Sequence, residues 1–338
     1  MTRIYFDHNA TTPVAPEVAE VITTTTRTVF GNPSSVHGYG QQAKTVLDEA
    51  RAAVAQLLGA EPTEIVFTSG GSESDNLAIR GAADSAFASG RRHLVTSAIE
   101  HEAVLRTVKA LSTRGWTATL VGVDASGVVT PERLTEALRN DTALVSVMHA
   151  NNEIGTIQPV ATLAAIAHER GALFHTDAVQ SAGKIPIDVQ ALDVDLLSIS
   201  AHKFNGPKGI GALWMRRGAQ LRAQLTGGKQ ERSRRAGTEN VPAIAGLGVA
   251  AKLANKNEAV ALDHLGTLRD RLEDGILTNV SGTQRNGEAL HRVNNTCNIS
   301  FDGVEAETLL IALDLEGIAV STGSACSSGS LEPSHVLQ

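Results

Sequence analysis

Apolar and polar residues alternate along this chain with two different periods. From residue 41 onward, segments with the period of a half-buried helix alternate with short, continuous apolar runs, which are typical of strands buried on both faces. We expect helices at residues 41–59, 73–89, 101–115, 131–140 and 160–171. We expect strands at residues 64–69, 93–98, 117–123, 143–150, 172–178, 195–203 and 209–215.

Repeated strand-helix-strand units of this kind predict an α/β fold, in which a mostly parallel sheet is sandwiched by helices. After about residue 255 the pattern changes, and a charged helix at 262–277 is followed by a strand at 296–303 and a helix at 307–317. We therefore expect a large domain at residues 15–254, and a smaller α+β domain formed by residues 1–14 and 255–338.

The composition narrows the class of protein. With 338 residues, of which 42% are apolar and 3% aromatic, the chain can bury a large core of Ala, Val, Leu and Ile. A net charge of -7 gives no general reason to bind nucleic acid, although residues 229–235 form a local basic run. No stretch resembles a secretion signal or a membrane span, so we expect a cytoplasmic protein without membrane contact.

Candidate chemistry follows five of the predicted strands. Ligands of parallel sheets bind at the carboxyl ends of the strands, so these residues are expected to converge on one crevice. They are Ser69 to Glu73, His101, Asn151 with Asn152, Asp177 and Lys203.

Lys203 is the best candidate for an amine that holds an aldehyde. It follows an apolar run and precedes a turn rich in Gly and Pro. A lysine must lose its proton to form a Schiff base, and packing at the dry edge of a sheet favours that loss. The alternative is an ordinary surface lysine after a strand.

Gly71 and Ser72 directly precede a predicted helix, and Asp75 lies three residues after Ser72, as in a capping box. Free N–H groups and the helix dipole make such an end suitable for an anion, so both residues are predicted to contact a phosphate. An ordinary capped helix is the alternative.

Asp177 follows a buried strand, where an unpaired carboxylate would be costly, so it requires a partner such as a protonated pyridine nitrogen. Gln180, one turn later, is placed to donate to a ring oxygen. His101 is suited to stack on a flat ring and to move protons, because its ordinary pKa is near neutrality. The alternatives are a helix cap for Asp177 and a structural role for His101.

The chain has two cysteines, too few for a disulfide framework or a four-thiolate zinc site, and we expect no metal. Cys326 lies in a Ser/Gly-rich segment, where a thiol is expected to be exposed and mobile, and is the candidate nucleophile. Cys297, in an alternating run, is expected to be a small buried hydrophobic residue.

Residues 246–251 match a relaxed dinucleotide fingerprint but lie in a helical run, so we discount them.

Nine motifs together resemble the cysteine desulfurases of the NifS/IscS type, which belong to the fold-type-I enzymes of pyridoxal 5'-phosphate (PLP). The motifs are YFDHNATTP, GNPSSVHGYG, FTSGGSESDN, IEHEAV, HANNEIGTIQP, HTDAVQSAGK, SAHKFNGPKG, RRAGTENV and STGSACSSGSLEPSHVL. The resemblance runs from residue 4 to the end of the chain.

The resemblance implies a role for each matching residue. Lys203 is implied to form the Schiff base with PLP, Asp177 to pair with its pyridinium nitrogen and His101 to stack on its ring as an acid or base. The remaining implied contacts are Gln180 and Asn152 near the ring oxygen, Gly71, Ser72, Ser200 and His202 at the phosphate, and Thr238 at a phosphate across a homodimer interface.

By the same resemblance, L-cysteine binds to PLP, the Cys326 thiolate attacks its sulfur, and alanine and an enzyme persulfide result. The longer spacing and SSGS pattern around Cys326 resemble the subgroup that serves iron-sulfur cluster assembly, with a sulfur acceptor or scaffold protein as partner. A selenocysteine lyase, an aminotransferase and a non-catalytic sulfur-assembly scaffold are the alternatives.

One feature departs from the family pattern. Members continue past the SHVL motif into a strand-and-helix region with the arginine that binds the substrate carboxylate, and no residue of this chain matches that arginine. We expect the sequence to be incomplete at its carboxyl terminus, because the small domain would otherwise expose much apolar surface.

Overall fold

The computed structural model describes residues 3–322 and 334–338. Its largest sheet has seven strands in the order β2-β8-β7-β6-β5-β3-β4. These are β2 (Ile65–Thr68), β3 (His93–Ser97), β4 (Thr117–Val121), β5 (Thr142–Ser146), β6 (Leu173–Asp177), β7 (Leu196–Ser200) and β8 (Gly211–Met215). Only β8 is antiparallel to its neighbours, β2 and β7. The expected mostly parallel sheet is therefore confirmed.

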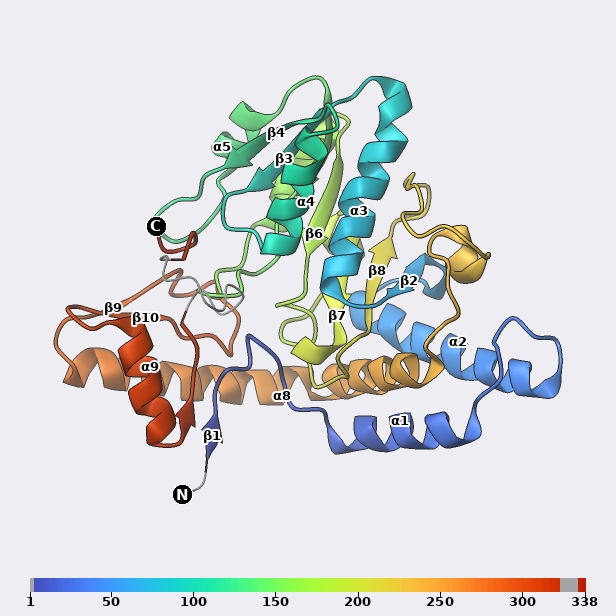
Figure 1. The fold of residues 1–338 in the computed structure, drawn as a ribbon. Coiled ribbons are helices and arrows are strands. Elements are labelled where there is room, and N and C mark those ends of the chain that lie inside the picture. Colours follow the sequence, from blue (N-terminus) through green and yellow to red (C-terminus); the bar gives the residue numbers. More distant parts are fainter. Residues whose placement is uncertain (1–2, 323–333) are drawn as a thin grey trace.

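Helices cover both faces of this sheet, and for this reason the residues of its inner strands are buried without alternation. All residues of β3, β5, β7 and β8 are buried, whereas the edge strand β4 is largely exposed. One face packs against α3 (Gly71–Ala86) and α4 (Glu102–Ser112). The other packs against α2 (Gly38–Leu58), α6 (Val160–Glu169) and α8 (Val241–Asn279). Figure 1 shows α2 and α8 on this side of the sheet.

The helix α1 (Pro16–Thr28) was not expected from the sequence. Four consecutive threonines, residues 23–26, oppose helix formation because their branched side chains lose rotamer freedom. The helix forms nonetheless, since Pro16 occupies its first turn and Val18 is buried in the core next to α8. Packing on a neighbour outweighs local propensity here.

The remaining helices are short. They are α5 (Pro131–Ala137), α7 (Val189–Leu192) and the 3-10 turns η1 (Pro62–Glu64), η2 (Phe87–Ser89), η3 (Ala201–Lys203) and η4 (Gln230–Ser233). α5 begins where the Thr130 side chain accepts the N–H of Arg133 and Pro131 takes the first helical position. No helix among the described residues combines the length and the hydrophobicity needed to cross a membrane.

Two small sheets lie beside the large one. β1 (Ile4–Tyr5) pairs in parallel with β11 (Ile318–Ala319), so the start of the chain lies next to a segment from near its end. β9 (Thr283–Arg285) and β10 (Ile299–Phe301) pair antiparallel, and α9 (Ala306–Leu315) packs near β11. The helix α8 continues through residue 254 without a break, so the two-domain division stays a prediction.

A buried ion pair holds an unusual turn at η4. Glu231, Arg232 and Ser233 have φ values of 45°, 56° and 64°, a conformation that costs non-glycine residues about 1–2 kcal/mol each. The Glu231 carboxylate accepts two hydrogen bonds from Arg51 at 2.7 Å and one from the N–H of Phe67 at 3.0 Å. These contacts fix the start of the segment that leads to Thr238.

Candidate active site

The carboxyl ends of the parallel strands open onto one edge of the large sheet, and most of the predicted site residues lie there. Asp177 and Ser200 are the last residues of β6 and β7, and Lys203 ends η3 directly after β7. His101 caps α4 after β3, and Gly71 opens α3 after β2. β2 shares the direction of β7 because both are antiparallel to β8.

The amine of Lys203 is held by the amino-terminal segment. Its Nζ donates to the backbone carbonyls of Asn9 and Ala10, at 2.5 and 2.9 Å. The Asn9 side chain is itself fixed, because its Nδ2 donates to the carbonyl of Asn152 and to the hydroxyl of Thr296. Sequence reasoning used this segment only as part of a motif and assigned it no contact with the lysine.

A cavity of about 420 Å³ lies between the start of α3 and the end of β7. It is lined by Ala10, Thr11, Ser69, Gly70, Gly71, Ser72, Glu73, Ser200, His202, Lys208 and Gly209. The first N–H groups of α3 have no partner within the helix and carry the positive end of its dipole. Gly70, directly before the helix, has a φ of 150°, which side chains disfavour. The cavity therefore suits a phosphate.

The predicted capping box of Ser72 and Asp75 is wrong. Ser72 lies inside α3, and Asp75 is buried. The carboxylate of Glu73 instead accepts the N–H of Ser69 at 2.7 Å, and Arg235 pairs with the same carboxylate. Ser72 is thus not needed as a cap and lines the cavity.

His202 and Lys208 contribute differently to the cavity. Burial, together with the charges of Lys203 and Lys208, lowers the pKa of His202 to about 4, so the ring is neutral near pH 7. Its Nδ1 lies 3.1 Å from the hydroxyl of Thr11. Lys208 is exposed and supplies positive charge. Sequence reasoning did not assign Lys208, although it shares the motif of residues 200–209.

Asp177 is a buried acid whose charge depends on its surroundings. Burial raises its pKa, and the electrostatic effects of His101 and Lys203, together with the N–H of Val179, limit the rise. Its Oδ1 accepts the N–H of Val179 at 2.9 Å. A protonated pyridine nitrogen beside Asp177 would favour the ionised carboxylate further, so this residue fits the predicted partner.

Hydrogen bonds orient the side chains of Gln180 and His101. The Nε2 of Gln180 donates to the carbonyl of Asn9 at 2.9 Å. The Nδ1 of His101 accepts the N–H of Ala103 at 3.1 Å, so the proton of the neutral ring is on Nε2. Nε2 is therefore the nitrogen that can exchange a proton.

Two further buried acids lie near Asp177, and sequence reasoning missed both. Burial raises the pKa of Glu100 to about 8, although Ser97 and the N–H of Met148 donate to its Oε1. Burial and the charge of Asp177 raise the pKa of Asp75 well above its ordinary value. Like charges repel strongly in a low-dielectric interior, and the raised pKa values of these two acids reduce the repulsion that an ionised Asp177 would meet. The position of Glu100 directly before His101 was the available signal.

Several predicted site residues are not among the lining of the cavity at α3, namely His101, Asn152, Asp177, Gln180, Lys203 and Thr238. Thr238 is exposed and does not line the cavity of this single chain. Cys326 lies outside the described residues. Cys297 is half-buried and precedes β10, so the expectation of a fully buried residue in a strand is wrong. Burial and the charge of Glu273 raise the pKa of Cys297 to about 11, and it is a thiol near pH 7.

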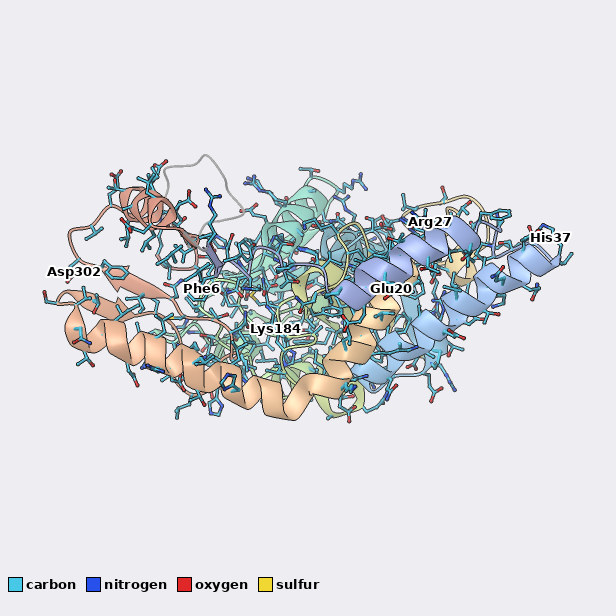
Figure 2. The ribbon with its side chains drawn as sticks, turned by 90° about the horizontal axis from the view of Figure 1, so that it is seen from below. Phe6, Glu20, Arg27, His37, Lys184 and Asp302 are labelled. Atoms are coloured by element: carbon cyan, nitrogen blue, oxygen red, sulfur yellow. The ribbon has the colours of Figure 1, made fainter. Side chains whose placement is uncertain are left out.

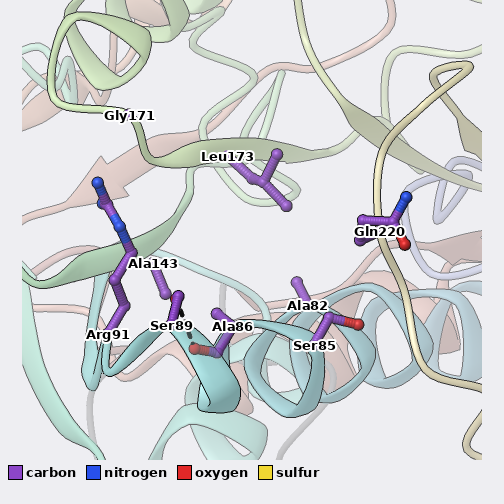
Figure 3. Close-up of a pocket in the computed structure, with 9 residues that line it drawn as sticks. All are labelled: Ala82, Ser85, Ala86, Ser89, Arg91, Ala143, Gly171, Leu173 and Gln220. Carbon is purple, nitrogen blue, oxygen red and sulfur yellow. Dashed lines mark hydrogen bonds between the residues drawn. The ribbon is translucent and has the colours of Figure 1, made fainter.

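A second cavity, of about 210 Å³, lies at the opposite edge of the sheet (Figure 3). Ala143 and Leu173 line it at the amino ends of β5 and β6. The guanidinium of Arg91, which also lines it, donates to the carbonyls of Thr142 and Arg170. None of the predicted site residues is among its lining, so we place the active site at the first cavity.

Comparisons with known proteins agree with this geometry. The family model described as aminotransferase class-V matches residues 4–337. A cysteine desulfurase IscS of Dictyoglomus turgidum is 49% identical over 334 residues, which cover 99% of this chain and 84% of that protein. The solved structure of a "NIFS-LIKE PROTEIN" is 41% identical, with a TM-score of 0.93 and coverage of 99% of this chain and 89% of that chain. The solved structure of "SspA in complex with cysteine" is 38% identical, with a TM-score of 0.87 and coverage of 99% and 93%.

The chain therefore belongs to the class-V aminotransferase family, whose enzymes use PLP and have the predicted fold type I. The described residues fit this cofactor: the cavity at α3 suits its phosphate, Asp177 its ring nitrogen and Lys203 its aldehyde. Within the family, the protein is a cysteine desulfurase.

The raised pKa of Glu100 predicts a dependence of stability on pH. The folded-state pKa of about 8 lies above the ordinary value of 4.5. The contribution of Glu100 to the free energy of unfolding is therefore fully present below pH 4.5 and is lost as the pH rises toward 8. Relative to Glu100→Gln, the wild-type free energy of unfolding should fall between pH 5 and 8 by roughly 1 kcal/mol per pH unit. Urea denaturation at several pH values measures this difference, and parallel curves for the two proteins would contradict it.

Proposed function

We propose that the protein converts L-cysteine to L-alanine and takes up the sulfur as a persulfide on Cys326. Cysteine and one enzyme thiol become alanine and one persulfide, so atoms and electrons balance without an added oxidant or reductant. The observation that carries this proposal is the placement of Lys203, Asp177 and the cavity for an anion at one edge of the sheet. It is supported by the similar protein SspA, whose solved structure is a complex with cysteine.

Each cofactor contact has a separate task in this proposal. Lys203 would hold PLP through its amine, and Asp177 would pair with the ring nitrogen. Gly71, Ser72, Ser200 and His202 would bind the phosphate, and Gln180 and Asn152 would lie near the ring oxygen. When bound, PLP supplies an electron sink for the negative charge that forms at the substrate α carbon.

Proton movement is assigned to Lys203 and His101. Two backbone carbonyls accept hydrogen bonds from the Lys203 amine and hold it at the edge of the sheet. The amine is therefore suited to accept the α proton of the substrate. His101 would stack on the cofactor ring, with Nε2 as the atom that gives or receives a proton, because Nδ1 is already bonded.

The sulfur-transfer step is assigned to Cys326. Its thiolate would attack the substrate sulfur, an S–S bond would form and the carbon–sulfur bond would break. Cys297 is unsuited to this step, because its pKa of about 11 leaves it protonated.

We infer that the persulfide serves iron-sulfur cluster assembly in the cytoplasm. Transfer of radiolabelled sulfur from the enzyme to a scaffold protein would test this inference.

We infer further that two copies of the chain form a homodimer. Phe30 and Val36, between α1 and α2, are 72% and 92% exposed, and Tyr39, in the first turn of α2, is 59% exposed. Phe30 contacts Tyr39 with ring centroids 5.0 Å apart. A second copy would cover these apolar side chains. Thr238, which is exposed, would then reach a phosphate of the partner subunit.

We also propose that residues 15–254 form one domain, and residues 1–14 with 255–338 the other.

The assignment of the thiol is tested with Cys326→Ala, with Cys297→Ala as the matched control. Cys326→Ala should keep its bound PLP and lose alanine formation from cysteine by at least about a hundredfold, since no other described thiol is suitably ionised. Cys297→Ala should stay within about twofold of the wild type. Equal rates of alanine formation in both variants would refute the role of Cys326.

The assignment of the anchoring amine is tested with Lys203→Ala. This variant should lose PLP on dialysis, together with its visible absorbance, because no covalent link holds the cofactor. Lys109→Ala, on the exposed side of α4, is the control and should retain both. Visible absorbance that persists in dialysed Lys203→Ala would exclude the assignment.

The homodimer is tested by sedimentation of the wild type and of Tyr39→Glu. The wild type should sediment as a dimer, and the added charge should shift the protein toward the monomer, because burying an unpaired carboxylate is costly. Leu290→Glu changes a residue that is 85% exposed on another part of the molecule and should leave the dimer intact. A monomeric wild type would refute the inference.

A further inference from the structure

A second lysine is buried beside the candidate site and has no part in the reaction proposed above. Lys184 is 8% exposed and follows β6 by a short turn. Figure 2 shows it near the centre of the molecule. Removing an amine from water is costly, so a buried lysine requires a partner. Its Nζ donates to the Oε1 of Gln180 at 2.6 Å.

Gln180 connects Lys184 with the amino-terminal segment. Its Oε1 accepts from Lys184, while its Nε2 donates to the same Asn9 carbonyl that accepts from Lys203. The oxygen and the nitrogen of an amide side chain are told apart by their hydrogen-bond partners. An ammonium group can only donate, so the atom of Gln180 that faces Lys184 is the oxygen. The contact with Lys184 therefore keeps the Gln180 oxygen away from Asn9 and leaves its nitrogen on the side of Lys203. That nitrogen has a second hydrogen to donate.

The backbone supplies a second, independent observation. Gly183 has a φ of 71°, and a side chain there would place its Cβ only 2.7 Å from the Cβ of Phe204. Phe204 directly follows Lys203. Only a glycine allows this close approach together with this φ value. The turn that carries Lys184 is therefore packed directly against the segment that carries Lys203.

We propose that Lys184 is a positioning residue for PLP, which holds the Gln180 amide so that its N–H group donates toward the cofactor ring oxygen. This inference rests on the role proposed for Gln180. The charged or titratable groups within electrostatic reach of Lys184 are Lys203 and His202, both in η3. Burial, together with the charge of Lys203, lowers the pKa of Lys184 to about 7. A neutral amine still has N–H groups to donate, so the contact persists in both protonation states.

The test is a double-mutant cycle read out as the PLP dissociation constant. Lys184→Met should raise this constant about tenfold, because the Gln180 oxygen is left buried without a donor. Gln180→Ala should raise the constant by a similar factor. The dissociation constant of the double variant should not exceed the larger of the two single-variant constants, because Lys184 acts through Gln180. Equilibrium dialysis of the holoenzymes against PLP measures all three. Lys109→Met, an exposed lysine on α4, is the matched control.

Conservative rescue and a stability measurement separate positioning from a purely structural role. Lys184→Arg keeps N–H donors and should stay within about threefold of the wild type. A structural role would lower the unfolding temperature of the cofactor-free protein and leave the PLP affinity of the folded protein unchanged. If Lys184→Met does not fold, Lys184→Gln takes its place in the cycle, because its side chain is shorter by one atom and loses the direct contact.

The outcomes distinguish this inference from the proposed function. An unchanged dissociation constant in Lys184→Met, with a tenfold loss in Gln180→Ala, would overturn only the role of Lys184. A double variant that binds PLP about a hundredfold more weakly than the wild type would also overturn the role of Lys184, since the two residues would then act independently. An unchanged constant in Gln180→Ala would overturn the proposed role of Gln180 itself.

Discussion

The site depends on the shared direction of β2, β6 and β7. Parallel strands expose their carboxyl ends at one edge of a sheet, so Asp177 and Lys203 meet there although 26 positions of sequence separate them. The antiparallel strand β8 lies between β2 and β7 and returns β2 to their direction. The start of α3, with its free N–H groups, therefore reaches the same edge. A reversed β2 would place the cavity for an anion at the opposite end of the molecule.

The amino-terminal segment completes the site from outside this sheet. The backbone carbonyl of Asn9 accepts hydrogen bonds from both Lys203 and Gln180, and its side chain contacts Asn152 and Thr296. One residue thus links the turns after β5, β6 and β7 with the segment before β10. The pairing of β1 with β11 holds the beginning of this segment. The positions of the lysine and the glutamine therefore depend on residues that are distant in the sequence.

Burial shifts the pKa values of several side chains around the crevice, and so decides which of them carry charge. Asp75 and Glu100 have raised pKa values because they are removed from water, and the pKa of His202 is lowered for the same reason. The raised pKa values disfavour the charged forms of both acids beside Asp177, and the neutral imidazole of His202 can serve as a hydrogen-bonding group. Lys208, which is exposed, supplies charge where an anionic group would enter. The class-V family and its cofactor agree with this arrangement.

The sequence by itself determined the strands of the large sheet, their order of appearance and the residues at their ends, because burial on both faces leaves continuous apolar runs and turns follow them. It also determined the family, through motifs that include Lys203. It did not predict β1, β9 or β11, which are only two or three residues long. Only the tertiary structure decided that α1 forms despite its threonines, that Glu73 rather than Ser72 serves the start of α3, and that Lys184 is buried. Each of these outcomes depends on neighbours that are far away in the chain, and local periodicity carries no information about such contacts.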